Sequence, residues 1–153
     1  MGDCRNIKFE HLQECDLKET WELCMKSFNE NFSYKEVQDT WELCKNDKHY
    51  HFIVGKCNGK IVAYTTMIVF HDLFDGLRPI ATLWYVCVDE QYRRKGIAGK
   101  MFKYLENIAE QHNCEIIYFT CLKDNFGAQK FYRSAGYSDE KEKAFVKYFF
   151  EEQ

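Results

Sequence analysis

The chain has 153 residues, of which 46% are hydrophobic, 17% aromatic and 29% charged, and its formal net charge is −3. A chain of this length suits one domain with one continuous core, and its apolar fraction excludes a disordered protein. No stretch reaches the roughly 20 consecutive apolar residues of a membrane-spanning helix, and the negative net charge argues against the broad basic face of a nucleic-acid-binding protein. We therefore expect a single domain over residues 1–153, with neither a membrane nor a nucleic acid as its partner.

The first part of the chain predicts a short strand and two amphipathic helices. The strand is expected at residues 7–9, and the helices at residues 17–28 and 34–46. Each helix contains the sequence Thr-Trp-Glu-Leu-Cys, starting at Thr20 in the first and at Thr40 in the second. Two copies are too few for a solenoid, so we interpret the similarity as chance resemblance between two core-facing helices.

The middle of the chain predicts three strands. Residues 51–56 and 60–70 flank the turn sequence Cys57-Asn58-Gly59, which is typical of a hairpin. Residues 80–88 are rich in aromatic and β-branched residues and end at the turn-forming pair Asp89-Glu90. They predict a buried strand.

A basic, glycine-containing loop follows that strand, with the sequence Arg93-Arg94-Lys95-Gly96-Ile97-Ala98-Gly99. Apolar residues then recur at helical spacing from Ile97 to Ala109, so the loop leads into a helix. The first N–H groups of a helix have no partner within it, its macrodipole is positive at that end, and glycine lets a ligand approach the backbone. Because three consecutive cations add to this field, the loop predicts a phosphate site. It contains neither a P-loop nor the dinucleotide-binding glycine pattern.

The remaining residues predict a strand, a helix and a last strand, at residues 116–121, 125–134 and 144–150. The expected order of elements is βααβββαβαβ. It indicates an α/β (α+β) protein with a mixed, twisted sheet flanked by helices on both faces.

Two sequence signatures resemble those of the GNAT-type N-acetyltransferase superfamily. The pattern Arg93-x-x-Gly96-x-Ala98 is similar to the pyrophosphate loop of that superfamily, and residues 122–137 are similar to its second signature: an Asn after a strand, a short helix with Phe-Tyr, then Gly-Tyr. The match is strong over about residues 80–150 and holds only in outline before them. The resemblance implies the GNAT acyl-CoA N-acyltransferase fold, and transfer of an acetyl group from acetyl-CoA to a primary amine by direct attack in a ternary complex.

The resemblance also implies roles for single residues. Tyr132 matches the general acid for the leaving thiolate, which suits a phenol that is protonated at neutral pH, although the ring would also serve as packing under its helix. Asn125 matches a position near the cofactor arm and is equally suited to cap the next helix. The backbone at residues 86–88 would bind the pantetheine arm and polarise the thioester carbonyl. The implied cofactor-binding residues are Val86, Cys87, Val88, Arg93, Arg94, Lys95, Gly96, Ile97, Ala98, Gly99 and Asn125.

The base that deprotonates the amine is less evident. Many members of the superfamily carry a Glu on the strand before the loop, whereas residues 81–88 contain no carboxylate. A chain of water molecules is one substitute, and the candidates by position are Glu30, Glu36, Asp72 and Asp75. Residues 27–34, which mix aromatic and polar side chains, are either an ordinary helix connection or part of an acceptor lid. No metal is expected, because His49, His51 and His71 lack the spacing of metal ligands.

Other functions stay open at this point. One alternative is a non-catalytic CoA-binding sensor or regulatory module of the same fold. Another is nucleic-acid binding through Arg93-Arg94-Lys95, which would require further basic and aromatic residues on the same face. For an enzyme, a small-molecule amine is favoured over a protein amine as acceptor, with amino sugars, polyamines and aminoglycosides all open. A homodimer is left open as well.

The eight cysteines contain no C-x-x-C pair, and several lie within apolar periodic segments. Cysteine behaves there as a small hydrophobe, so we expect buried, reduced thiols and a cytoplasmic protein. Residues 1–6 likewise lack the apolar core of a signal peptide.

Overall fold

The computed structural model describes residues 4–150, so residues 1–3 of the N-terminal segment considered above and residues 151–153 lie outside the described part. The chain divides into two compact units, Met1–Phe119 and Thr120–Gln153, and each is described by itself. The single domain expected from the sequence stays a prediction. In the described part, no helix is long and apolar enough to cross a membrane.

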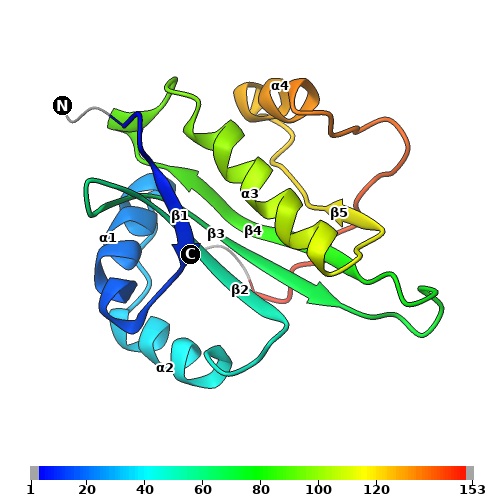
Figure 1. Cartoon of the computed structure of the whole chain (residues 1–153), viewed down its shortest axis with the longest axis horizontal. Helices are drawn as coiled ribbons and strands as arrows, with labels where there is room; N and C mark the ends of the chain where they lie inside the picture. The colour runs from blue at the N-terminus through cyan, green and yellow to red at the C-terminus, as the bar shows by residue number, and fades with distance from the viewer. Residues whose placement is uncertain (1–3, 151–153) are drawn as a thin grey trace. The chain divides into compact units, whose positions relative to one another are not determined.

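The first unit contains a five-stranded mixed sheet with helices on both faces (Figure 1). The strands lie in sequence order; the first four pair antiparallel and β5 joins β4 in parallel. They are β1 (Lys8–His11), β2 (Tyr50–Cys57), β3 (Lys60–Phe70), β4 (Ile80–Val88) and β5 (Ile116–Tyr118). The helices α1 (Leu17–Phe28) and α2 (Tyr34–Cys44) lie on one face and α3 (Ile97–Gln111) on the other; η1 (Glu14–Asp16) and η2 (Glu90–Tyr92) are single 3₁₀ turns. The fold class predicted from the sequence is confirmed.

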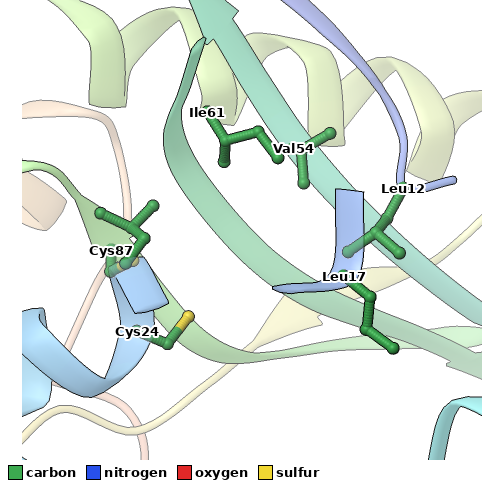
Figure 2. Close-up of a cluster of buried hydrophobic side chains, with 7 residues drawn as sticks. Leu12, Leu17, Cys24, Val54, Ile61 and Cys87 are labelled. Atoms are coloured by element: carbon green, nitrogen blue, oxygen red, sulfur yellow. The ribbon is translucent and has the colours of Figure 1, made fainter. Parts of the chain in front are cut away.

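Side chains that alternate along β2 build a separate core on each face of the sheet. Val54 packs with Leu17 and Cys24 in the cluster on the α1 side, which Figure 2 shows. The Cβ position of its neighbour Gly55 lies beside Phe9, whose ring centroid is 5.9 Å from that of Tyr104 of α3. A Cβ at Gly55 would lie 2.7 Å from the ring of Phe9, so the sheet needs a glycine there. The buried face of α3 is the one its spacing predicts: Ile97, Met101, Phe102, Leu105, Ile108 and Ala109.

Strand β4 contains a β-bulge that the sequence did not predict. Between two regular pairs, Thr65 of β3 faces two residues of β4, Tyr85 and Val86. Tyr85 has a φ of 58°, in the left-handed region, and the Thr65 hydroxyl donates to the carbonyl of Trp84 at 3.0 Å. The extra residue shifts the alternation of β4, so the side chains that follow it face differently from a regular strand.

The second unit contains one helix, α4 (Phe126–Ser134), among its described residues. The prediction of a last strand at residues 144–150 is wrong, because these residues form no strand. A strand needs a neighbour for its backbone hydrogen bonds, and the described part of the second unit holds no other strand. The apolar side chains that suggested it are exposed: Phe145, Val146, Tyr148, Phe149 and Phe150.

The prediction of reduced cysteines is wrong for one pair. Cys4 and Cys57 form a disulfide, with their Cα atoms 5.5 Å apart. The two are 53 positions apart in sequence, and they meet because β1 pairs with the end of β2. The other cysteines carry free thiols, and of these Cys24, Cys44 and Cys87 are buried as expected.

Candidate functional site

The basic loop leaves β4 through η2, which is fixed at its start by Asp89. The buried Asp89 accepts a hydrogen bond from the Gln91 N–H at 3.0 Å and donates its own N–H to the Val62 carbonyl at 2.7 Å. Downstream, Arg94 and Gly96 have φ values of 62° and 75°. Two left-handed residues so close together curl the backbone into a tight loop at the start of α3.

Gly96 is the N-cap of α3, and a Cβ built on it meets no atom within 4 Å. The space in front of the loop is therefore open, and the glycine is required by its conformation, which L side chains rarely adopt. The amides of Ile97, Ala98 and Gly99 lie in the first turn, where no acceptor within the helix exists. Backbone N–H groups in such a loop form a concave site for anions, to which the helix dipole adds.

The three cations of the loop differ in their surroundings. Arg94 is exposed, whereas Arg93 donates from Nε to the Val88 carbonyl at 3.2 Å and ties the loop to the end of β4. The ammonium of Lys95 lies 5.4 Å from the ring centroid of buried Tyr92, and that of Lys60 approaches the same ring at 5.4 Å. Lys60 thus adds a positive charge near the loop that the motif alone did not reveal.

The structure brings residues 86–88 next to this loop and leaves one edge of them unpaired. The ladder between β4 and β5 covers only residues 80–82 of β4 and ends at Tyr118. Beyond it, the C-terminal half of β4 has no neighbouring strand on that side among the described strands. Backbone N–H and C=O groups on such an edge can bind an extended ligand.

A cavity of about 340 Å³ lies on the other side of β4, between the sheet and helices α1 and α2. The repeated segments of these helices both contribute to it. Thr20 and Thr40 each donate to the carbonyl four residues earlier, at 2.9 and 3.0 Å, and the tryptophan that follows each threonine lines the wall. The aromatic lining residues are Trp21, Phe32, Trp41, Phe52, Tyr64 and Tyr85.

One of the four candidate carboxylates lines this cavity, and a second is hydrogen-bonded to a residue of its wall. Glu36 is one of its lining residues, and Glu30 accepts a hydrogen bond from the hydroxyl of Tyr85. Burial and this hydrogen bond raise the pKa of Tyr85 above its usual range. Asp72 and Asp75 instead organise the loop before β4, where they accept backbone N–H groups at 2.9 and 2.8 Å.

Cys87 has another cysteine as its partner. A hydrogen bond between Cys24 of α1 and Cys87 raises the pKa of Cys24 and lowers that of Cys87, while burial opposes the change at Cys87. A cysteine nucleophile needs a base such as histidine beside it, whereas the partner of Cys87 is a second thiol.

The histidines named as conceivable metal ligands have separate partners. His49 and His71 each contact an aspartate, at 2.7 and 2.6 Å. The buried His51 lies 3.0 Å from His11, Nδ1 to Nε2, and its ring centroid lies 5.2 Å from that of His112. Within residues 4–150, no group of three or more His, Cys, Asp or Glu side chains could hold a metal ion.

A model described as the acetyltransferase (GNAT) family matches residues 17–137. The chain belongs to the GNAT acetyltransferase family. Members of this family use acetyl-CoA as their acetyl donor.

Solved structures share the GNAT fold at low sequence identity. An aminoglycoside acetyltransferase from an uncultured soil sample, in complex with trehalose, is 24% identical, with a TM-score of 0.84 over 97% of this chain and 100% of its own. Glucosamine-6-phosphate N-acetyltransferase from Arabidopsis thaliana is 20% identical, with a TM-score of 0.80 over 95% and 100%. A transcriptional regulator from Bacillus halodurans is 19% identical, with a TM-score of 0.84 over 94% and 100%.

Two of the predicted site residues belong to the second unit: Asn125 is the N-cap of α4 and Tyr132 lies within that helix. The Asn125 side chain accepts a hydrogen bond from the Ala128 N–H at 3.2 Å, so it caps the helix, which is one of its two predicted roles. The Tyr132 ring packs against Phe131, with centroids 5.6 Å apart. Burial, and then proximity to the Cys121 thiol, raise the pKa of Tyr132 to about 12, so its hydroxyl is protonated at neutral pH.

Proposed function

We propose that the protein is an N-acetyltransferase that moves the acetyl group of acetyl-CoA to a primary amine by direct attack in a ternary complex. The observation that carries the proposal is the loop before α3. Left-handed Gly96, the free amides of the first helical turn and the exposed Arg94 face open space beside an unpaired strand edge. This combination suits a ligand that has a pyrophosphate at one end and an extended amide-containing arm at the other.

The donor roles follow from this arrangement. The amides of Ile97, Ala98 and Gly99 would bind the pyrophosphate, with Arg94 and Lys95 adding charge. The backbone at residues 86–88 would bind the pantetheine arm and orient the thioester carbonyl. We assign Arg93 the role of supporting the loop, because its Nε donates a hydrogen bond to the Val88 carbonyl. Asn125 stays a proposed contact of the arm, with the capping bond as its structural role.

The chemistry needs a neutral amine and a stabilised leaving group. The amine nitrogen attacks the thioester carbonyl carbon, the C–N bond forms and the C–S bond breaks. Before the attack, the amine loses its first proton to water or to the Glu30–Tyr85 pair. After the attack, the nitrogen loses its second proton, which neutralises the departing thiolate. A phenol with a pKa of about 12 is a weaker acid than a thiol, whose ordinary pKa is about 8.5. Tyr132 would therefore stabilise the departing sulfur by donating a hydrogen bond to it, and the proton that neutralises the thiolate would come from the attacking nitrogen.

A small-molecule amine is the proposed acceptor. Two of the proteins that share the fold are named for small amines, an aminoglycoside and glucosamine 6-phosphate. The cavity next to β4 lies at the lower end of the volumes that suit small ligands, about 300 to 1,000 Å³. A cytoplasmic location is proposed as well; the free thiols support it and the Cys4–Cys57 disulfide weighs against it.

The test combines cofactor binding with turnover. Release of CoA from acetyl-CoA is measured across a panel of amines, and CoA affinity is measured separately by calorimetry. Gly96→Asp should weaken CoA binding about 10²-fold or more, because a carboxylate would enter the pyrophosphate site. Gly76→Asp is the matched control, since Gly76 also has a positive φ, of 63°, and open space around it. Equal affinities of the two variants would contradict the loop assignment, and CoA binding without turnover on any amine would favour a sensor module.

A further inference from the structure

The cavity between α1, α2 and the sheet has a wall chemistry that restricts what it can bind. Six of its lining residues are aromatic, and they come from all sides of it: Trp21 and Phe32 from α1 and the segment after it, Trp41 from α2, and Phe52, Tyr64 and Tyr85 from the sheet. The remaining wall consists mostly of Leu, Val, Met, Cys and Thr side chains. Such a wall stabilises a ligand mainly by burying apolar surface.

Most polar groups of the wall are already paired within the protein, and the buried indole N–H of Trp41 is one that has no hydrogen-bond partner. The Tyr64 hydroxyl is 2.5 Å from the Thr66 hydroxyl, and the indole N–H of Trp21 donates to the Phe32 carbonyl at 2.9 Å. The Tyr85 hydroxyl donates to Glu30. The two lining threonines from the repeated segments bond to their own helices. A ligand with many hydroxyls would lose its hydrogen bonds to water and would find few free partners in the wall. Buried hydroxyls without a partner oppose binding.

The charge at the cavity favours a cation. Glu36 lines it at the exposed start of α2, where its carboxylate also accepts the Ser33 N–H at 3.3 Å. A carboxylate has about four acceptor positions, so Glu36 keeps room for an ammonium group. Glu30 lies beside Tyr85 and adds a second negative charge. Aromatic faces also attract cations, and Tyr85 and Trp41 supply such faces.

The bulge of β4 links the cavity to the proposed donor strand. Tyr85 has the left-handed φ of the bulge and lines the cavity, and the next residue begins the 86–88 segment assigned to the pantetheine arm. From these observations we propose that the cavity is the acceptor site and takes an arylalkylamine, a primary amine on an aromatic, hydroxyl-poor body. This inference rests on the proposed acetyltransferase function. It separates the protein from the amino sugar and aminoglycoside enzymes that share its fold.

The experiment compares acceptors and cavity variants. CoA release is measured with phenethylamine, glucosamine 6-phosphate, kanamycin and spermidine, and binding of phenethylamine is followed by tryptophan fluorescence in the presence of CoA. We expect kcat/KM for phenethylamine to exceed that for the sugars by about 10²-fold or more. Val37→Phe fills the cavity and should lower kcat/KM for phenethylamine about tenfold or more. Leu43→Phe adds similar bulk to the same helix at a side chain that is 82% exposed, and should leave it unchanged.

A second variant covers the case in which Val37→Phe does not fold. Glu36→Gln keeps the size and the capping ability of the side chain and removes the charge. It should raise KM for phenethylamine about 3- to 10-fold and leave the affinity for CoA unaltered.

The two proposals fail in different ways. Efficient acetylation of a sugar or of spermidine, with no turnover and no fluorescence change for phenethylamine, would overturn the arylalkylamine site and leave the acetyltransferase intact. If no amine is acetylated by protein that binds CoA, the acetyltransferase proposal fails. Binding of phenethylamine that is lost in Val37→Phe and kept in Leu43→Phe would then still support the ligand class of the cavity.

Discussion

The buried His51 should make the stability of the protein depend on pH in a window that can be stated in advance. Burial first, and then the neighbouring His11 and His112, lower the pKa of His51 from 6.5 to about 4. Below pH 6.5, His51 binds a proton in the unfolded chain but not in the folded chain. Its contribution to the free energy of unfolding is therefore fully present above that pH and is lost as the pH falls toward 4. Each pKa unit corresponds to about 1.4 kcal/mol, so the full loss is about 3 kcal/mol.

About 2 kcal/mol of that loss falls between pH 7 and pH 5, by the same proton-binding relation. The measurement is urea unfolding followed by circular dichroism at both pH values, for the wild type and for His51→Gln. Between pH 7 and pH 5, the free energy of unfolding of His51→Gln should fall by about 2 kcal/mol less than that of the wild type, because the other titrating groups are common to both proteins. His49→Gln is the control, since His49 is exposed and contacts Asp47. An unaltered pH dependence in His51→Gln would refute the argument.

Three further predictions concern the loop, α4 and the sheet. Replacing Arg94 and Lys95 together by Ala should weaken CoA binding and flatten its salt dependence while leaving affinity for dephosphorylated pantetheine unchanged; equal losses for both ligands would indicate a structural role. Tyr132→Phe should lower kcat about 10²-fold with little change in the KM for acetyl-CoA, and wild-type turnover would remove Tyr132 from the mechanism. Gly55→Ala should lower the free energy of unfolding by about 1–3 kcal/mol, because the new Cβ would contact Phe9; an unchanged melting temperature would mean that the ring moves aside freely.

The parts of the fold that local patterns control were predictable. Residues 17–28, 60–70 and 80–88 were predicted with the bounds that the structure has, because apolar spacing and turn residues define them within a few positions. The loop around Gly96 was predicted for the same reason, since the chemistry of a helix start depends on adjacent residues.

Features that depend on distant segments were not predictable. Cys4 and Cys57 become neighbours only through strand pairing, and the apolar run at residues 144–150 suggested a strand although no partner strand lies beside it among the described residues of its unit. Trp21 and Trp41 both line the cavity between their helices and the sheet. That they leave a space between them and the sheet depends on how the two helices pack, which neither helix encodes alone.

The β-bulge in β4 places one extra residue in this strand relative to its partner β3. A regular strand alternates its faces, and the extra residue at Tyr85 and Val86 reverses the assignment of every position after it. Deleting one of these two residues would leave the composition of β4 nearly unchanged and would turn Cys87 out of its core cluster. The length of this strand is therefore under as strict a constraint as its sequence, and a relative without the extra residue would need the opposite inside–outside pattern from this point to the loop.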